Sequence, residues 1–387
     1  MSSKNRIWRR AALAVVLAVS GCTYDADDTS PSPTAADAFA SLERQVQLFM
    51  DQGAVAAVVQ FRWPEGEWSR AFGLRDLESQ TPAQTTDRVE IASVTQTMTA
   101  VAVLRLVDDH IIGLDDPVND VIPGFTAALK PPGPITVRQL LSHTSGMPEV
   151  NDALPHDVDF RPVLSRTLTM ERGLKVAGTL PWTASSVGLF MYSNTNYLAL
   201  GLLVQTLRHK PFVQVMREEV FEPLGLRNTG LGRLDLHESG LLHGYVTLRG
   251  ERVDTTDNAF AAGSPAAGAV STMADVNLFM AGLFQGQAVS AASLREMKTS
   301  PGFGRYGLGL WQHGDGCSAA KRYEGRGSFW DYQTIAVSSD DGRYQAAMTV
   351  TAPPMPTEFE DPSSEYWRDL LNGQIESTLN ETLDRLC

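Results

Sequence analysis

Residues 89–100 of the chain read Val-Glu-Ile-Ala-Ser-Val-Thr-Gln-Thr-Met-Thr-Ala, and this segment predicts a strand or loop leading into a helix that ends near Asp109. After the β-branched run, apolar residues recur at helical spacing, namely Val94, Met98, Val101, Ala102, Leu104 and Val107. Ser93 then falls in the first turn, where unpaired backbone N–H groups and the helix dipole favour negative charge. The serine is therefore either a nucleophile whose attack creates an oxyanion, or simply an N-cap.

The first 21 residues have the pattern of a secretory signal. Four basic residues precede the apolar run 11–19, which is too short for a stable membrane span. Residues 19–22, Val-Ser-Gly-Cys, resemble the bacterial lipobox, in which the cysteine becomes the lipidated first residue of the mature protein. We expect Cys22 to be lipidated and to anchor the exported protein on the outer face of the bacterial cytoplasmic membrane. The alternative is ordinary signal cleavage nearby, with Cys22 incidental.

The charge balance argues against anionic partners that are bound through general electrostatics. Removal of residues 1–21 leaves 28 basic and 45 acidic residues, a net charge of −17. This charge argues against nucleic acid and against anionic lipid, so the lipid anchor would be the only membrane attachment. Residues 22–36 are rich in Asp, Ser, Thr and Pro and predict a disordered tether. The remaining residues, 37–387, suffice for one large core or two closely packed subdomains.

The order of the remaining patterns predicts an α+β fold. Helical spacing or capping signals predict helices over 37–50, 94–109, 135–146, 197–207, 211–220, 271–283 and 363–386, and a short helix that follows the turn 114–117 and ends at 121. Strand patterns occur over 55–63, 68–74, 306–311, 328–337 and 344–351. We therefore expect an antiparallel sheet built from both chain ends and flanked by helices, with 37–90 and 300–387 as its α/β part. Residues 91–299 would form a mainly helical inserted subdomain.

Several ordered landmarks carry a family resemblance. They are 68–76, 91–95, 114–118, 135–146, the Tyr-Ser-Asn at 192–194, 271–275 and the Tyr-Gly-Leu-Gly-Leu at 306–310. With these landmarks the chain from about Asp37 to Cys387 resembles the superfamily of serine β-lactamases, class C-like enzymes among them, and D-alanyl-D-alanine carboxypeptidases. The pattern is most similar to the secreted serine D-Ala-D-Ala carboxypeptidases, and related esterases share it. The resemblance implies the β-lactamase/DD-peptidase fold.

The resemblance also implies roles for individual residues. In this superfamily a serine of an S-x-x-K motif attacks the carbonyl, the tyrosine of Y-x-N relays a proton, and a K/H-T-G strand supplies positive charge. By position Ser93 resembles the nucleophile and Tyr192 the general base and acid, while Asn194 would hold the substrate amide. The backbone N–H groups of Ser93 and Ser328 would form the oxyanion hole.

Two positions depart from the family pattern. Gln96 stands where the lysine of S-x-x-K belongs, and an amide has neither a titratable proton nor a charge. Counting back from Tyr332 places the third motif at Gly325-Arg326-Gly327, with glycine in place of the cation. The other register, residues 323–325 (Tyr-Glu-Gly), also lacks the cation. These losses predict weak or absent amidase activity, whereas an ester demands less of the base.

Two residues near the third motif bear on substrate binding. Arg326 is either a replacement charge that binds a substrate carboxylate or a solvated strand residue. Trp311 follows the Gly-Leu-Gly-Leu segment, where carboxypeptidases of the superfamily can carry an arginine for the terminal carboxylate of the peptide. Gly325, Arg326, Gly327 and Trp311 are therefore the candidate substrate-binding residues.

The cysteines and histidines suggest structural roles. After Cys22 only Cys317 and Cys387 remain, and in an exported chain they form either one disulfide or two free thiols. The resemblance implies the disulfide. His143 resembles a structural loop residue of the family, and His243 a turn residue near the rim of the site. The seven histidines show no metal-binding spacing and no phosphate-binding glycine loop follows a strand, so we expect neither a metal nor another cofactor.

Two functions remain open at the level of the sequence. The first is a lipid-anchored serine hydrolase that acts through an acyl-Ser93 intermediate on peptidoglycan-like peptides, β-lactams or small esters. The second is a catalytically inactive lipoprotein on the same scaffold that binds or senses cell-wall peptides or β-lactams. Ancestry favours the first function, and the missing charges at Gln96 and Gly325 favour the second.

Overall fold

The computed structural model describes residues 34–154, 165–232, 240–248, 250–257, 259–301, 304–318, 320–351 and 364–387. The predicted signal at 1–21, Cys22 and most of the tether lie outside these residues. Helix α1 (Ala35–Asp51) begins with a capping box in which the Thr34 side chain accepts from the Asp37 N–H and the Asp37 carboxylate accepts from the Thr34 N–H. Residues 35 and 36, which we assigned to the tether, are therefore helical.

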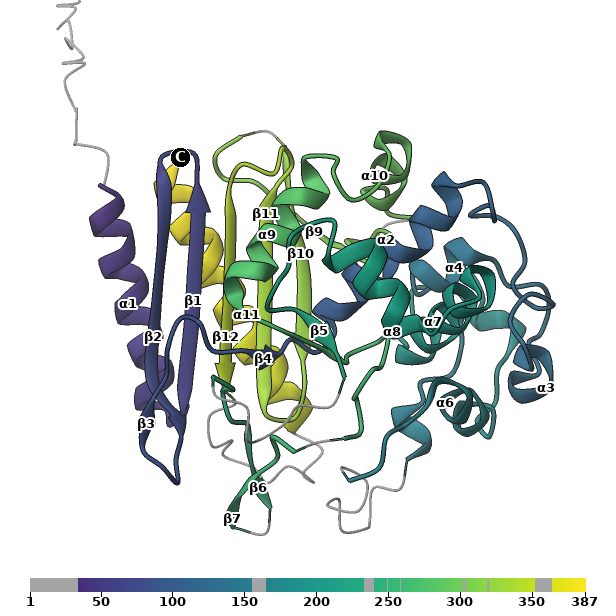
Figure 1. Ribbon diagram of the computed structural model, residues 1–387, viewed down its shortest axis with the longest axis horizontal. Helices are drawn as coiled ribbons and strands as arrows, with labels where there is room; N and C mark the ends of the chain where they lie inside the picture. The colour runs from purple at the N-terminus through teal and green to yellow at the C-terminus, as the bar shows by residue number, and fades with distance from the viewer. Residues whose placement is uncertain are drawn as a thin grey trace, which may run out of the picture.

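A seven-stranded antiparallel sheet joins the two ends of the chain (Figure 1). Its early strands are β1 (Ala56–Trp63), β2 (Gly66–Asp76) and β3 (Thr81–Pro82), and its late strands are β9 (Trp311–Gly314), β10 (Lys321–Ser328), β11 (Tyr332–Ser339) and β12 (Gln345–Thr351). The order is β3-β2-β1-β12-β11-β10-β9. Strand β1 pairs with β12, with Ala57 opposite Val350, so the predicted sheet built from both chain ends is confirmed.

Helices cover both faces of this sheet. Helix α1 and the C-terminal helix α11 (Ser364–Leu386) pack on one face, where α1 buries Phe39, Leu42, Val46 and Phe49 and α11 buries Ile375, Leu379 and Leu383. Helices α2 (Val94–Asp108) and α9 (Met273–Phe284) contact the other face. Nearly every residue of α2 is buried, which explains its weak amphipathic pattern.

The middle of the chain forms the predicted mainly helical part, to the right of the sheet in Figure 1. Its helices are α3 (Phe125–Leu129), α4 (Val137–Leu141), α6 (Met170–Ala177), α7 (Asn194–Arg208), α8 (Phe212–Val215) and α10 (Ala291–Met297), with a π-helical turn at Met216–Phe221 and short 3₁₀ turns at Asn151–Ala153 and Ala184–Ser186. Strands β4 (Val89–Glu90), β8 (Ala269–Ser271) and β5 (Gly230–Leu231) form a small sheet, and β6 (Tyr245–Leu248) and β7 (Glu251–Asp254) a hairpin. Within the described residues, no helix combines the length and the apolarity that a membrane crossing requires.

The predicted elements differ from the structure at several points. Residues 114–121 form turns, and the short helix lies later, at α3. The strand expected over 306–311 begins only at Trp311, because Gly309 has a left-handed φ of 83°. The resemblance implied a strand at Arg326, but no local strand pattern predicted β10, because its buried Arg322 and Glu324 give a core strand the composition of a polar segment.

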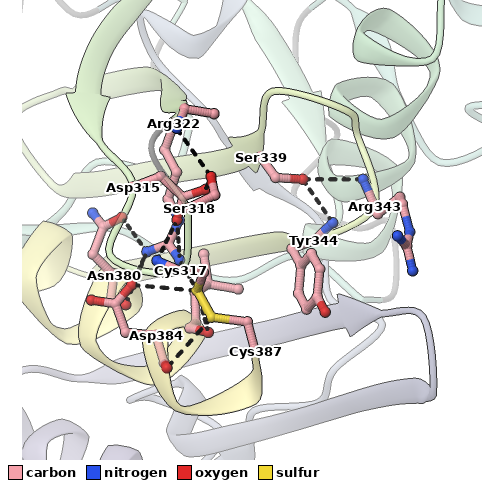
Figure 2. Close-up of polar contacts among 12 residues, drawn as sticks. Asp315, Cys317, Ser318, Arg322, Ser339, Arg343, Tyr344, Asn380, Asp384 and Cys387 are labelled. Carbon is pink, nitrogen blue, oxygen red and sulfur yellow. Dashed lines mark hydrogen bonds and ion pairs between the residues drawn. A yellow bond between two sulfur atoms is a disulfide. The ribbon is translucent and has the colours of Figure 1, made fainter.

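A disulfide ties the end of α11 to the segment between β9 and β10 (Figure 2). Cys317 and Cys387 are joined with their Cα atoms 5.9 Å apart, so the interpretation as two free thiols is wrong. Beside them the guanidinium of Arg322, only 2% exposed, pairs with Asp315 at 2.9 Å and with Asp384 at 2.7 Å. The disulfide and these ion pairs hold α11 against the sheet.

Candidate active site

Ser93 lies in a tight turn between β4 and α2. The preceding Ala92 has a φ of 45°, a left-handed conformation that costs a non-glycine residue on the order of 1–3 kcal/mol and often marks functional sites. Ser93 occupies the N-cap position, but its side chain makes no capping hydrogen bond. Its hydroxyl is instead hydrogen-bonded to the hydroxyl of Tyr192. The side-chain capping role is therefore wrong, and the serine hydroxyl is available at the N-terminus of α2.

Gln96 lies one helical turn beyond Ser93 and contacts two residues of the Tyr-Ser-Asn segment, Tyr192 and Asn194. Its Nε2 donates to the hydroxyl oxygen of Tyr192 at 2.6 Å and to Oδ1 of Asn194 at 3.1 Å. Asn194 begins α7, and its Oδ1 also lies 3.5 Å from the Tyr192 hydroxyl. The structure thus brings Ser93, Gln96, Tyr192 and Asn194 together, with the neutral amide of Gln96 at the centre.

His143 fixes the orientation of the Gln96 amide. The His143 Nδ1 faces two donors, the backbone N–H of Ser193 at 3.2 Å and Nδ2 of Asn196 at 3.1 Å. The ring proton must therefore sit on Nε2, which donates to Oε1 of Gln96 at 3.2 Å. Burial lowers the pKa of His143 to about 3, so the ring is neutral. His143 is a structural residue, as the resemblance implied, and its contact leaves the Gln96 N–H groups to face Tyr192 and Asn194.

A half-buried carboxylate that the sequence analysis missed holds Asn194 from the other side. Glu149 accepts hydrogen bonds from the backbone N–H of Asn194, from Asn194 Nδ2 at 3.1 Å and from the backbone N–H of Asn151 at 3.0 Å. Because Glu149 binds Nδ2, Oδ1 of Asn194 must face Gln96. Burial raises the pKa of this carboxyl above its ordinary value. The only sequence signal for Glu149 is a charge in the turn that follows the predicted helix 135–146.

The environment of Tyr192 keeps its phenol protonated. The residue as a whole is 39% exposed, but its hydroxyl points inward to Ser93, Gln96 and Asn194. Burial is the largest influence and raises the pKa of Tyr192, and the negative charge of Glu149 raises it further. The hydrogen bonds from Ser93 and Gln96 act in the opposite direction but do not overcome burial. At neutral pH the candidate proton relay is therefore uncharged.

Strand β10 passes close to the serine and leaves no room for a large side chain. A Cβ atom on Gly327 would lie 2.2 Å from the backbone oxygen of Ile91, and one on Gly325 would lie 3.2 Å from Thr97 Oγ1. Both glycines therefore face the start of α2. Ser328 ends the strand opposite Gln333 and lines the same cleft as Ser93.

Arg326 points to the opposite face of β10, because neighbouring residues of a strand alternate in direction. Its guanidinium pairs with Glu324 at 2.9 Å and with Glu376 of α11 at 2.6 Å, and it lies 5.0 Å from the ring centre of Trp311. His313 lies between the same two carboxylates, with one ring nitrogen 3.0 Å from each, and its pKa is raised to about 9. Arg326 is therefore neither a solvated side chain nor a cation placed where Gly325 lacks one.

A cleft of about 630 Å³ opens beside the hydroxyl of Ser93. Its polar lining includes Tyr192, Asn194, Arg326 and Ser328, and Trp311 stands at its edge beside Arg326. The cleft also has walls that the sequence analysis did not identify, formed by Phe260, Phe329, Trp330 and the first turns of α11, namely Arg368, Asp369, Asn372 and Gly373. Its volume suits a small organic substrate.

Three groups of described side chains offer metal-ligand atoms close together, and the third, Asp315, Cys317 and Asp384, includes a disulfide-bonded cysteine. In the first, His313, Glu324 and Glu376, a different carboxylate faces each ring nitrogen and Arg326 contacts both carboxylates, which is the geometry of an ion-pair network. In the second, His243 Nδ1 lies 2.7 Å from Asp254 and 3.8 Å from Asp76. Both carboxylates of this second group accept N–H or O–H donors of their own turns.

Comparison with known proteins shows what this chain is similar to. A family model described as Beta-lactamase matches residues 42–363. Penicillin-binding protein 4* of Bacillus subtilis (strain 168) is 26% identical over 246 residues, which are 60% of this chain and 53% of that protein. The chain thus spans about half the length of this curated relative.

Solved structures give the same fold over most of the chain. A D-stereospecific amidohydrolase from Streptomyces sp. superimposes with a TM-score of 0.70 at 26% identity, covering 81% of this chain and 94% of that one. The D-amino acid amidase of Ochrobactrum anthropi SV3, solved with L-phenylalanine amide, superimposes with a TM-score of 0.72 at 22% identity, covering 90% and 98%. At 22% identity the likeness to the amidase is one of fold alone.

Proposed function

The chain belongs to the β-lactamase family of serine hydrolases, and from this premise we propose that Ser93 is acylated by activated esters and then deacylated by water. The observation that carries the proposal is the contact of the Ser93 hydroxyl with Tyr192, whose oxygen is held by Gln96. Amides and β-lactams would react slowly at the same site. The roles of Gln96, Tyr192, Asn194 and Ser328 below are parts of this proposal.

In the acylation step, Oγ of Ser93 attacks the carbonyl carbon while its proton passes to the oxygen of Tyr192. The phenol gives its own proton to the leaving oxygen of the substrate, so Tyr192 stays neutral and an alcohol leaves. The hydrogen bond from Gln96 Nε2 steadies the phenol oxygen during this exchange. In the deacylation step, water attacks the acyl carbonyl and the same proton transfers run in the opposite direction. A carboxylic acid is released and Ser93 is restored.

Charge that develops on the carbonyl oxygen needs donors fixed in advance. The N–H of Ser93 lies at the start of α2, where the first amides of a helix have no intrahelical acceptor. The N–H of Ser328, at the end of β10, would be the second donor. Gly327 allows this arrangement, because its backbone approaches Ile91 more closely than any side chain would permit.

Among the described residues, no cation contacts Tyr192, and this lack separates esters from amides. Loss of a catalytic proton-transfer group usually lowers the rate by roughly 10²–10⁴. An amide needs its nitrogen protonated before it can leave, and the neutral Tyr192–Gln96 pair drives that step poorly. An aryl ester expels an oxygen anion that leaves with little help. We therefore infer that the missing charge affects amides far more than activated esters.

Kinetics with a matched pair of substrates tests this proposal. Wild type should hydrolyse p-nitrophenyl butyrate but hardly the corresponding p-nitroanilide, and Ser93→Ala should abolish both activities. Tyr192→Phe should lower kcat/KM by about 10²-fold or more for the anilide, and by less for the aryl ester. Equal losses for the two substrates, with the melting temperature unchanged, would contradict the assigned role of Tyr192.

One observation favours a second candidate function. Gln96 makes hydrogen bonds with Tyr192, Asn194 and His143 without providing a base. A site that has lost catalysis and only binds cell-wall peptides or β-lactams would need the same. In that case the chain would bind such a ligand reversibly and form no covalent adduct at Ser93. Intact-mass measurement separates the two functions.

We further propose that the protein is exported and anchored through lipidated Cys22, with the following residues as a tether. Support comes from the basic and apolar leader and the Val-Ser-Gly-Cys segment at 19–22. Expression in a bacterial host fed an alkyne fatty acid tests this proposal. Wild type should incorporate the label and Cys22→Ala should not; label that persists in Cys22→Ala would refute it.

A further inference from the structure

Part of the wall of the cleft beside Ser93 is aromatic. Phe260, Phe329 and Trp330 are here called the aromatic wall. Trp330 contacts both phenylalanines in tilted arrangements, with its ring centre 5.5 Å from that of Phe260 and 4.3 Å from that of Phe329. Leu168 and Leu198 also line the cleft. Such a surface gains free energy by covering an apolar or aryl group.

The apolar surface continues outside the cleft. Leu189, Phe190 and Met191, here called the apolar lip, are 58%, 44% and 47% exposed and directly precede Tyr192. Phe190 lies 5.8 Å from Trp311, which lines the cleft, measured between ring centres. Three adjacent large apolar side chains exposed beside a cleft are typical of a binding surface.

The charged groups of the cleft do not favour an anionic substrate. Arg326 is paired with two carboxylates, and these are shared with His313, so the cations and anions of the cluster balance. Arg368 likewise has an interaction partner. Asp369 adds an exposed carboxylate to the lining. Among the described residues of the cleft, both arginines are thus engaged, and a substrate carboxylate would have to displace an existing partner.

From these observations we propose that the acyl donor is an uncharged ester with an aryl or bulky aliphatic acyl group and no carboxylate next to the scissile bond. This proposal rests on the proposed function and adds its substrate class. The aromatic wall holds the acyl group, the apolar lip covers what extends from the cleft, and the Arg326 cluster excludes carboxylates because its charge is already balanced.

Removal of a partner of Arg326 tests whether its existing ion pairs exclude a substrate carboxylate. Glu376→Gln removes one of the two carboxylates that engage Arg326, without touching the Ser93–Tyr192–Gln96 group. The freed guanidinium should then accept a substrate carboxylate. Glu381→Gln is the matched control, because it removes the same charge from an exposed position farther along α11, where Glu381 contacts Ser377.

The hydrolysis of esters and the binding of ligands are both measured with the full chain. Wild type should favour p-nitrophenyl phenylacetate over the acetate, and p-nitrophenyl butyrate over its carboxylate analogue mono-p-nitrophenyl succinate, each by at least 10-fold in kcat/KM. Glu376→Gln should reduce the butyrate preference at least 3-fold, and Glu381→Gln should not. Trp330→Leu should reduce the phenylacetate preference, with the melting temperature as the check on folding.

A binding arm separates this proposal from the function it rests on. Ser93→Ala should bind N-phenylacetylglycine methylamide at least 10-fold more tightly than N-phenylacetylglycine, which carries a free carboxylate, as measured by calorimetry. Tighter binding of the methylamide, together with no ester hydrolysis by wild type, would support the preference for uncharged acyl groups. The same result would refute the proposed hydrolase function. Hydrolysis with a preference for the succinate, or tighter binding of the carboxylate ligand, would overturn the substrate class. Binding of neither ligand would also overturn it.

Discussion

Gln96→Lys tests the idea that the missing charge limits amide hydrolysis. The Gln96 Nε2 already contacts Tyr192 at 2.6 Å and Asn194 at 3.1 Å, and a lysine ammonium would reach the same two oxygens. A charge-assisted hydrogen bond is roughly twice as strong as a neutral one, which gives about 10-fold through stabilisation of the phenolate alone. Recovery of proton transfer adds to this gain, so we expect kcat/KM for a p-nitroanilide to rise by about 10²–10³-fold.

The same substitution should lower stability, because lysine cannot accept the N–H of His143. That buried donor now bonds to Oε1 of Gln96 at 3.2 Å, and leaving it unpaired costs about 1–3 kcal/mol. At about 2 °C per kcal/mol for a chain of this size, the melting temperature should fall by about 2–6 °C. The nearby carboxylate of Glu149 limits the loss, since it partly balances the new charge.

The assay compares the p-nitroanilide and the p-nitrophenyl ester for wild type, Gln96→Lys and Gln96→Met, with Tm measured for each. Methionine matches glutamine in length but donates no hydrogen bond, so Gln96→Met should lose activity on both substrates. The gain in Gln96→Lys should be larger for the anilide than for the ester. A folded Gln96→Lys protein with unchanged anilide hydrolysis would refute the argument that the missing charge beside Tyr192 limits amide hydrolysis.

Three further predictions concern stability. Burial raises the pKa of Asp331 to about 7, so its contribution to stability is present below pH 4 and is lost as the pH rises through 7. Only the part of this decline between pH 5 and 7 falls within urea titrations at pH 5 and 8, so Asp331→Asn should remove about 2.5 kcal/mol of the difference between them, and an unchanged difference would contradict the assignment. His313, with a pKa of about 9, contributes fully to the free energy of unfolding below pH 6.5 and loses this contribution as the pH rises through 9. The melting temperature of wild type should therefore fall more between pH 7 and 10 than that of His313→Gln. Replacement of Cys317 and Cys387 by alanine should lower the free energy of unfolding by about 4 kcal/mol, because the disulfide spans 70 residues; a loss below 1 kcal/mol in denaturant titrations would show that the ion pairs of Arg322 suffice.

The sequence predicted the parts of the fold that depend on local pattern. Helical spacing placed α2 and α7, and the hairpin pattern placed β1 and β2, because the residues that form each of these patterns lie within the element itself. Local pattern missed strand β10 for a physical reason. Its buried Arg322 and Glu324 are stabilised by partners on α11 and near β9, and no local pattern shows that such partners exist.

Some residues of the candidate site were likewise predicted from local pattern, and others were missed. The three-residue spacing of Ser93 and Gln96 placed both on one helix face, and the ordered landmarks indicated Tyr192 and Asn194. Glu149 was missed because it reaches Asn194 across 45 residues from a turn without periodicity. Strand alternation indicates that Arg326 faces away from Gly325, but only the topology shows that α11, with Glu376, covers that face.

The intact mass of the protein after incubation with an activated ester tests the central claim most directly. The full chain is mixed with excess p-nitrophenyl phenylacetate, quenched in acid within seconds and measured beside Ser93→Ala. If Ser93 is a working nucleophile without a cation beside it, wild type should gain the mass of one phenylacetyl group, mapped to Ser93, and Ser93→Ala should gain none. An unmodified wild type, or an adduct that persists in Ser93→Ala, would contradict the account.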